Sequence, residues 1–379
     1  MGTKKNKQVE VVDIIKDKHV VVLSIRQSEM LVMVKHLRTV LPDFVRTLPV
    51  LSWIRMTCIY GEVRFEATDL EQRAVYCFPA LPDAPDIDIL LDAGWLENIL
   101  QLQEGMLELV ISGTLGVELH SRRRWDLFSG TGPEKSIGRL RTDLKQMVGD
   151  YPVWPARAPV LASMPFDPGK FHCAGAMAST DYSRGVLCGV NIDHEHITGT
   201  DGKRLYRSPH GIPGQQGLSL TLPYNTRIRR ILAFPDGAKV RLDIYKETAD
   251  ITHSACRITV KLPGGTYPNY RQVIPSEFQH RFTVDDPRRF EKVLTLLKRQ
   301  NVENEMFHLS EGRLIFQTVP ETFGCSGNVP ALDFCLNPKF LLSYLQVAAP
   351  GRVEWQMNDG TSPMQINGEF IQMPVIDKR

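Results

Sequence analysis

Two short segments contain residue types that could support chemistry. His194–His196 reads His-Glu-His, and imidazole and carboxylate groups are common zinc ligands. No distant third ligand accompanies it, and the seven cysteines are scattered without a C-x-x-C pair. Gly130–Ser136 faintly resembles a phosphate-binding loop, but Glu134 replaces the glycine before Lys135, and its carboxylate would repel a phosphate. We therefore expect no metal and no cofactor.

Other residue patterns give little support for catalysis. No Ser-His-Asp or Cys-His arrangement stands in a recognisable motif, and the acidic residues show no paired spacing tied to a glycine-rich or metal-binding loop. Arg122–Arg124 precedes the strand-like segment Trp125–Phe128, where alternate side chains face opposite sides, so these arginines are typical of a solvated edge. We predict no catalytic residues.

The composition is that of an ordinary globular protein. The 379 residues are 42% hydrophobic and 23% charged, and this length predicts two or three domains. No segment approaches the roughly 18 apolar residues of a membrane span, and Val20–Leu23 is too short for a signal-peptide core. The odd number of scattered cysteines indicates free thiols in a reducing cytoplasm. The net charge of +2 leaves a nucleic-acid partner to be judged from the distribution of charge.

Amphipathic helices are predicted at three places with similar surroundings. The first runs from Met30 to Leu41, with Ser28 as N-cap and Pro42 ending the pattern. Asp167-Pro168 and Asp286-Pro287 each supply an N-cap and a first-turn proline to the other two. The third helix has the strongest amphipathic pattern in the chain.

Each helix precedes two strand-like runs around a turn, and a second helix follows. The strands are Trp53–Tyr60 with Val63–Ala67, Val186–Ile192 with His196–Gly199, and Met306–Leu309 with Leu314–Thr318. The second helices are Asp92–Leu102, Thr226–Phe234 and Asn337–Val347. Thr-Asp pairs at Thr68 and Thr200 close the first two hairpins about 130 positions apart, close to one third of the chain. This period predicts three tandem domains, each with two helices and two small sheets, rather than a solenoid of short repeats.

The predicted division places an N-terminal extension at residues 1–18 and domains at 19–157, 158–278 and 279–379. The first domain contains an insertion at about 130–149, which is charged and partly helical in pattern through Ile137, Leu140, Leu144 and Met147.

Six motifs in this order resemble those of the bacterial DNA polymerase III beta sliding clamp family. Gly199–Leu205 (GTDGKRL) is similar to the family's T-D-G-x-R-L, and Thr266–Pro275 (TYPNYRQVIP) to its F-P-D-Y-R-R-V-L-P. The others are Leu48–Leu51 with Ala67–Glu71, Asn337–Leu342, Ser362–Ile366 (SPMQI, like S-P-V-Q-I) and Met373-Pro374. The resemblance spans residues 19–376, and the order of the motifs identifies the chain as a divergent member of that family.

The resemblance implies an α+β fold of three similar clamp domains, each with two helices packed on antiparallel sheets. Two chains would join head to tail in a homodimeric ring, with helices lining the hole around duplex DNA. Such a ring tethers the replicative polymerase and catalyses nothing. Its implied partners are the DNA polymerase III alpha subunit, clamp-loader subunits, other polymerases and repair proteins, which bind through short peptides. The implied location is the cytoplasm, at the nucleoid, with no membrane partner.

The resemblance also implies an apolar groove for partner peptides, in which apolar anchors carry most of the binding energy. Gln272 stands where the family often has arginine, and Val375–Arg379 differs from the family's short tail, which leaves the peptide preference open. Ordinary core packing at a domain junction is the alternative interpretation. Carried over by motif position, the groove would use Leu187, Thr200, Gly202, Arg204, Leu205, Pro268, Gln272, Val273, Pro363, Ile371, Met373, Pro374 and Val375.

Duplex DNA inside a ring needs positive charge without sequence reading, because phosphate attraction still permits sliding. Helical lysines and arginines meet that need, and the alternative is that they form solvated helix faces. The candidates are Lys35, Arg38, Arg227, Arg229, Arg230, Arg288, Arg289, Lys292, Lys298, Arg299 and Lys339, with Arg46 in a loop resembling the family's DNA-contacting loop.

Two other hypotheses stay open on the sequence. The first is an accessory clamp homologue with a dedicated partner, favoured by the insertion, the altered tail and a calculated pI near 8.1 in a family that is usually acidic. The second is a nuclease or metal-dependent hydrolase whose resemblance to clamps is accidental.

Overall fold

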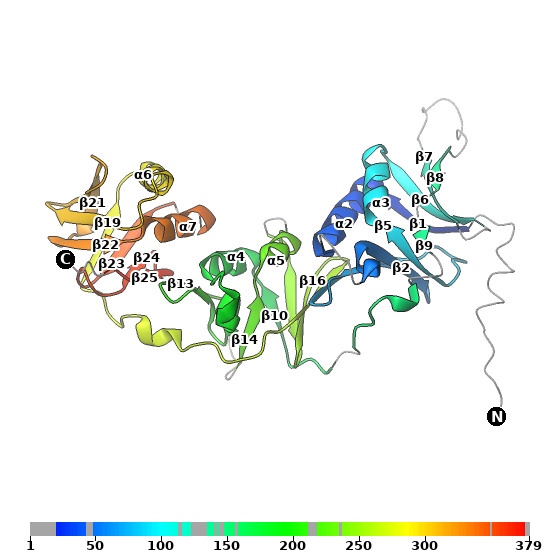
Figure 1. Cartoon of the computed structure of the whole chain (residues 1–379), viewed down its shortest axis with the longest axis horizontal. Helices are drawn as coiled ribbons and strands as arrows, with labels where there is room; N and C mark the ends of the chain where they lie inside the picture. Colours follow the sequence, from blue (N-terminus) through cyan, green and yellow to red (C-terminus); the bar gives the residue numbers. More distant parts are fainter. Residues whose placement is uncertain are drawn as a thin grey trace. The chain divides into compact units, whose positions relative to one another are not determined.

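The computed structural model describes residues 20–42, 48–112, 116–122, 135–139, 142–143, 148–155, 158–210, 218–234, 237–348 and 351–375. The chain forms two compact units. The first comprises Met1–Met164 with Arg230–Lys261, and the second comprises Pro165–Arg229 with Leu262–Arg379. Both consist of antiparallel sheets with a few helices, so the predicted α+β class is confirmed (Figure 1).

Within the described residues, one order of elements occurs three times: a strand, a helix, four strands, a helix and three strands. The first occurrence comprises β1 (Val20–Arg26), α2 (Gln27–Val40), β2 (Trp53–Ile59), β3 (Glu62–Thr68), β4 (Gln72–Pro79), β5 (Ile87–Asp92), α3 (Ala93–Gln101), β6 (Met106–Ser112), β7 (Gly116–Arg122) and β8 (Lys135–Arg139), followed by the short β9 (Thr142–Asp143). The second comprises β10 (Ala162–Phe166), α4 (Pro168–Met177), β11 (Gly189–Asp193), β12 (His196–Thr200), β13 (Arg204–Pro209), β14 (Ser219–Pro223), α5 (Thr226–Ile231), β15 (Val240–Ile244), β16 (Thr248–His253) and β17 (Cys256–Lys261). The third comprises β18 (His280–Val284), α6 (Pro287–Arg299), β19 (Glu305–Ser310), β20 (Arg313–Phe316), β21 (Thr322–Asn328), β22 (Leu332–Leu336), α7 (Pro338–Ala348), β23 (Val353–Met357), β24 (Met364–Ile366) and β25 (Phe370–Gln372). The threefold pattern agrees with the predicted repeat, while the domain limits at 157 and 278 stay a prediction.

The strands of each repeat are ordered in the same way. The first strand and the last three form one row, as in β1-β6-β7-β8, and the middle four form another, as in β4-β3-β2-β5. In the third repeat the two rows are also joined, because β18 pairs with β21. The last strand of the second repeat, β17, pairs antiparallel with β4, the third of the middle four strands of the first repeat. The last strand of the third repeat, β25, pairs antiparallel with β13, which holds the same position in the second repeat. These two pairings continue the sheets from one repeat into the next.

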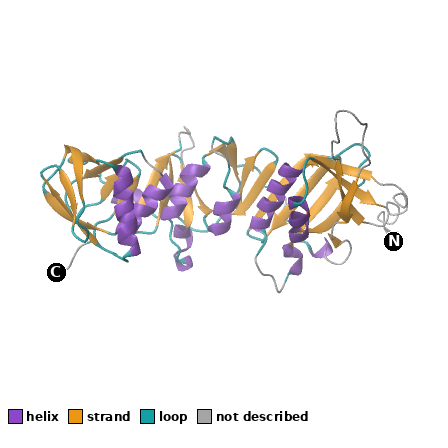
Figure 2. Ribbon diagram, turned by 90° about the horizontal axis from the view of Figure 1, so that it is seen from above, coloured by secondary structure: helices purple, strands orange, loops and turns teal. Residues whose placement is uncertain are grey.

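Helices cover these sheets with their apolar sides. Figure 2 shows the helices, in purple, lying over the strands. In the first unit α2 contacts α3 as well as β3 and β4, and in the second unit α6 contacts α7, which also contacts α4. The buried residues of α6 are Phe290, Val293, Leu294 and Leu297, which recur at the spacing of one helix face. The core therefore lies between each helix and the sheet beneath it.

Aspartates begin three of the helices. The side chains of Asp92, Asp167 and Asp286 accept hydrogen bonds from backbone N–H groups three residues onward, at 2.9, 3.0 and 3.0 Å. The predicted Asp-Pro starts of α4 and α6 are confirmed. The predicted cap of the first helix at Ser28 is wrong, because α2 already begins at Gln27. The Gln27 N–H donates to the Gly105 carbonyl instead, so a distant segment satisfies the helix start.

Three other sequence predictions need correction. Residues Val186–Cys188 belong to a 3₁₀ helix, Tyr182–Cys188, and the strand predicted from Val186 begins only at Gly189. The helix predicted to reach Phe234 ends at Ile231. Ile137, assigned to a partly helical pattern, lies in strand β8, which pairs with β7. Leu140, Leu144, Met147, Trp125–Phe128 and the N-terminal extension lie outside the described residues.

His36 on α2 lies beside the β4–β17 pairing. Its Nε2 is 2.5 Å from the Ile231 carbonyl, and its Nδ1 is 2.7 Å from the Tyr76 hydroxyl. Because a carbonyl oxygen only accepts, Nε2 carries a proton, and in the neutral imidazole Nδ1 then accepts from the Tyr76 hydroxyl. The Cys256 sulfur lies 3.8 Å from Nδ1. Burial lowers the pKa of His36, and the hydrogen bond to Ile231 opposes this effect.

We expect wild-type protein to lose more stability than a His36→Gln variant as the pH falls from 7.5 to 5. The His36 pKa is near 6.5 in the unfolded chain and lower in the folded chain, so the unfolded chain binds the proton first as the pH falls. Between these two pKa values, the free energy of unfolding falls by up to about 1.4 kcal/mol per pH unit. Urea-denaturation midpoints at the two pH values measure this. His308→Gln, on β19, is the control, and equal losses in wild type and His36→Gln would contradict the assignment.

Candidate functional site

The turn between β12 and β13 carries the T-D-G-x-R-L motif. The Thr200 hydroxyl donates to the Arg204 carbonyl at 2.6 Å and accepts from the Gly202 N–H at 3.0 Å. Asp201 Oδ1 accepts from the N–H groups of Lys203 and Arg204 at 2.9 and 3.1 Å. Gly202 has φ of +85°, in the left-handed region that favours glycine. The motif residues thus close a tight turn on their own side chains.

Arg204 joins this turn to two helices. Its Nε donates to Asp201 Oδ2 at 3.1 Å, its Nη2 lies 3.3 Å from the Ala176 carbonyl at the end of α4, and its Nη1 donates to the Ser343 hydroxyl of α7. The guanidinium also lies over the Phe340 ring, 4.7 Å from its centroid. Burial lowers the Arg204 pKa, opposed by Asp201, and the residue positions the turn rather than presenting a free charge.

Beside the turn lies an apolar cluster, here called the Leu205 cluster. Its buried members are Leu205, Tyr267, Tyr270 and Ile371, and Val186, Leu187 and Ile274 pack against it. Strand pairing places Leu205 opposite Ile371. Val273 lies next to Ile274 in sequence, and Met373 lies two residues after Ile371. Val273 is 48% exposed and Met373 is 41% exposed. The cluster therefore has apolar neighbours that solvent reaches.

The structure brings together only part of the predicted groove. Leu187, Leu205 and Ile371 meet in the Leu205 cluster, and Thr200, Gly202 and Arg204 form the adjoining turn. Pro268, Gln272 and Val273 are exposed on the loop that carries Tyr267 and Tyr270. Pro363 precedes β24, and Pro374 and Val375 are partly buried after β25, with the Val375 N–H bonded to the Cys335 carbonyl at 2.8 Å. Motif matching thus found the turn and the loop.

Four members of the Leu205 cluster were missed by the sequence analysis. Tyr267 and Tyr270 stand inside the Thr266–Pro275 motif, so the two aromatic residues in that motif were the available signal. Val186 and Ile274 carry no such signal, because each is an ordinary apolar residue next to a predicted one.

The basic candidates have different surroundings. On α6, Arg288, Lys292 and Arg299 stand opposite the buried stripe, at the spacing of a single helix face. Arg289 pairs with Glu321, and Arg38 on α2 pairs with Glu97 of α3, so these two charges are partly offset. The others are Lys35, Arg229, Arg230 and Lys298, all exposed, Arg227 and Lys339, both partly buried, and Arg46, which lies outside the described residues.

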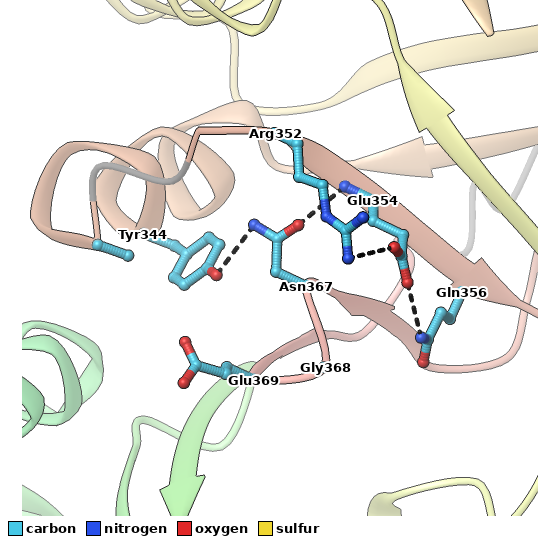
Figure 3. A pocket seen from close by; sticks show the side chains of 8 residues that line it. Tyr344, Arg352, Glu354, Gln356, Asn367, Gly368 and Glu369 are labelled. Carbon is cyan, nitrogen blue, oxygen red and sulfur yellow. Dashed lines mark hydrogen bonds and ion pairs between the residues drawn. The ribbon is translucent and has the colours of Figure 1, made fainter. Parts of the chain in front are cut away.

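A polar pocket of about 350 Å³ lies in the second unit, and none of the predicted groove residues lines it (Figure 3). Asn367 donates to the Tyr344 hydroxyl at 3.2 Å and accepts from the Glu354 N–H at 2.8 Å. Arg352 pairs with Glu354 at 2.9 Å. Its lining groups are therefore bonded largely to one another.

The titratable groups of the described residues do not assemble into a reactive centre. Burial raises the pKa of Cys173 to about 11 and that of Cys256 to about 12, which keeps both thiols protonated. The cysteines are free of disulfides, as predicted. Within this part of the chain no three His, Cys, Asp or Glu side chains are placed to hold a metal ion, and no helix has the length and apolar character of a membrane span.

Comparison with known proteins relates the chain to bacterial clamps. No family model matches the chain. A curated beta sliding clamp of Synechocystis sp. is 24% identical over 218 residues, and the match covers 49% of this chain and 56% of that protein. A crystal structure of the Pseudomonas aeruginosa sliding clamp matches with a TM-score of 0.74 at 19% identity, over 94% of this chain and 100% of that one. The Helicobacter pylori beta clamp bound to a DNA ligase peptide matches with a TM-score of 0.72 at 16% identity, over the same shares.

The fold is that of the bacterial DNA polymerase sliding clamps. In the matched part of its sequence and in the motifs of the turn and loop, the chain is similar to the curated beta sliding clamp.

We expect Gly202→Ala to lower the free energy of unfolding by about 1 to 2 kcal/mol, because the left-handed backbone brings a Cβ close to the next carbonyl oxygen. Chemical denaturation of the full chain measures the change. Gly264→Ala is the matched control, since its Cβ would meet nothing within 4 Å and its φ is not positive. An equal loss in both variants would contradict the role given to the turn.

Proposed function

We propose that this protein is a DNA sliding clamp: a homodimeric ring of three similar domains per chain, with limits near residues 157 and 278, which encircles duplex DNA and confers processivity on the replicative polymerase. The observation that carries the proposal is the strand addition between successive repeats, β17 onto β4 and β25 onto β13. The clamp catalyses nothing itself and acts in the cytoplasm at the nucleoid.

Strand addition supports head-to-tail closure. The last strand of the first repeat, β8, stands at the end of its sheet with β7 as its one neighbour among the described strands. The strand of the third repeat that matches β4 and β13 in position is β21. Its residues Cys325–Asn328 pair with β18 of the same repeat, and Thr322–Gly324 pair with β20, so an added strand would pair beside Thr322–Gly324. If β8 of one chain joins β21 of a second chain, the rule that links the repeats within one chain also links two chains, and two such junctions close a ring.

The exposed basic helices support sequence-independent DNA binding. Arg288, Lys292 and Arg299 present three cations on one face of α6, and Arg229 and Arg230 add two on α5. Long cationic side chains attract phosphates without reading bases, so DNA can slide. We assign the whole predicted basic set to this role.

The Leu205 cluster supports binding of partner peptides. A peptide with apolar anchors would cover Val273 and Met373 and extend the buried contacts of Leu205 and Ile371. The DNA polymerase III alpha subunit, clamp-loader subunits, other polymerases and repair proteins are the proposed partners. The ligase peptide bound to the H. pylori clamp supports this class of ligand.

We expect the loaded protein to stay on nicked circular plasmid through a high-salt wash and to leave once the plasmid is linearised. A ring is held by topology, whereas phosphate contacts weaken steeply with salt. Gel filtration of the plasmid after loading at high protein concentration or with a clamp loader measures retention. Loss that follows salt alone, whatever the DNA topology, would count against the ring.

We expect Val273→Glu and Met373→Glu each to weaken binding of a fluorescent DNA ligase peptide by more than about tenfold, because a charge would be buried against apolar anchors. Fluorescence anisotropy measures the Kd. Val347→Glu is the matched control, as Val347 is 42% exposed on α7 outside the Leu205 cluster. Equal effects in all three variants would argue against this site.

A further inference from the structure

We propose that Asp193 is a positioning residue for the partner-peptide site, where its carboxylate fixes the loop that carries Pro268, Gln272 and Val273 to the β11–β12 hairpin. This inference rests on the proposed function, because it concerns the affinity of that site for peptides.

The two oxygens of the Asp193 carboxylate have separate partners. Oδ1 accepts from the N–H groups of Glu195 and His196, both at 2.8 Å, and so closes the turn between β11 and β12. Oδ2 accepts from the Tyr270 hydroxyl at 2.7 Å and from Arg271 Nη2 at 3.1 Å. One oxygen therefore holds the hairpin turn, and the other holds the loop.

The loop has a further contact with the same hairpin. Arg271 Nη2 also lies 3.0 Å from Glu195 Oε2, so one guanidinium is shared by two carboxylates of the turn. Asn269 accepts from the Arg271 N–H at 3.3 Å and begins the 3₁₀ helix Tyr270–Val273. The backbone next to Arg271 is thereby fixed together with its side chain.

This arrangement connects two parts of the proposed site. The Tyr270 ring is buried in the Leu205 cluster while its hydroxyl reaches Asp193, and Val273 follows three residues later on the exposed side. The other end of the hairpin leads through β12 to Thr200 and the turn before Leu205. The Asp193 contacts therefore set where Val273 lies relative to Leu205, and a preformed site binds a peptide without first ordering its own loop.

The Asp193 carboxylate is held in its ionised form. Burial acts to raise its pKa, but the Tyr270 hydroxyl, the two turn N–H groups and Arg271 together keep the pKa below its usual range. An ionised oxygen accepts stronger hydrogen bonds than a neutral one, which suits a residue with four donors.

Asp193→Asn tests the assignment because it can keep the hydrogen bonds that close the β11–β12 turn while changing those that hold the loop. If the asparagine oxygen keeps the turn, its NH₂ group faces Arg271, which can only donate, and Tyr270, whose hydroxyl would have to turn and accept. The charged contact with Arg271 is then lost, and the loop is held less firmly. Asp243→Asn is the matched control: Asp243 is 7% exposed against 8% for Asp193, and it accepts from Ser163 at 2.6 Å and from Arg241 at 3.0 Å in the other unit. Tyr270→Phe, which keeps the ring and removes only the hydroxyl, and Arg271→Ala serve if Asp193→Asn does not fold.

We expect Asp193→Asn to raise the Kd for the fluorescent DNA ligase peptide on the order of tenfold and to speed hydrogen–deuterium exchange in residues 266–275, with Asp243→Asn within twofold of wild type. Adding Arg271→Ala to Asp193→Asn should weaken binding less than the two single changes sum to, since both remove one linked set of contacts. A Kd within twofold of wild type for Asp193→Asn, or an equal loss in Asp243→Asn, overturns the assignment. Failure of the wild-type protein to bind the peptide contradicts the proposed function itself, and the assignment falls with it even where exchange in the loop still rises.

Discussion

The architecture depends on main-chain pairing between the end of one repeat and the side of the preceding one. In β17 and β4, five residue pairs run from Cys256 opposite Tyr76 to Val260 opposite Gln72. The β25–β13 pairing is shorter, with Arg204, Leu205 and Tyr206 opposite Gln372, Ile371 and Phe370. A free sheet edge exposes unpaired N–H and C=O groups, so each addition satisfies an edge that would otherwise invite other strands. His36 beside one junction and the Leu205 cluster beside the other both depend on these pairings.

The elements that local sequence specifies were predicted well. Asp167-Pro168 and Asp286-Pro287 mark helix starts because the cap and the proline act within one turn of the chain. The cap predicted at Ser28 was wrong because the Gly105 carbonyl, far along the sequence, accepts from the Gln27 N–H at the start of α2. The strand predicted over Val186–Cys188 was wrong because Val186 and Leu187 lie in a 3₁₀ helix and pack against the Leu205 cluster. At both of these places a distant segment supplies the partner, which the local pattern cannot show.

The same limit applies to the candidate site. The turn at Thr200–Arg204 is visible in sequence because its hydrogen bonds span four residues or fewer. Tyr270 and Asp193 lie 77 positions apart, and nothing in either segment indicates that the tyrosine hydroxyl meets that carboxylate. The basic set was recognisable by residue type, yet the pairing of Arg38 with Glu97 required tertiary structure.

The turn beside the Leu205 cluster and the basic helix faces place different geometric demands on their residues. Gly202 must adopt a left-handed backbone, Asp201 must reach two N–H groups, and Arg204 must meet two helices, so few other residues satisfy these positions. Phosphate attraction needs only an exposed cation on a helix, and lysine or arginine at several neighbouring positions of α6 would serve. Under the proposed function, the exposed helix faces therefore tolerate more substitutions than the turn beside the Leu205 cluster does.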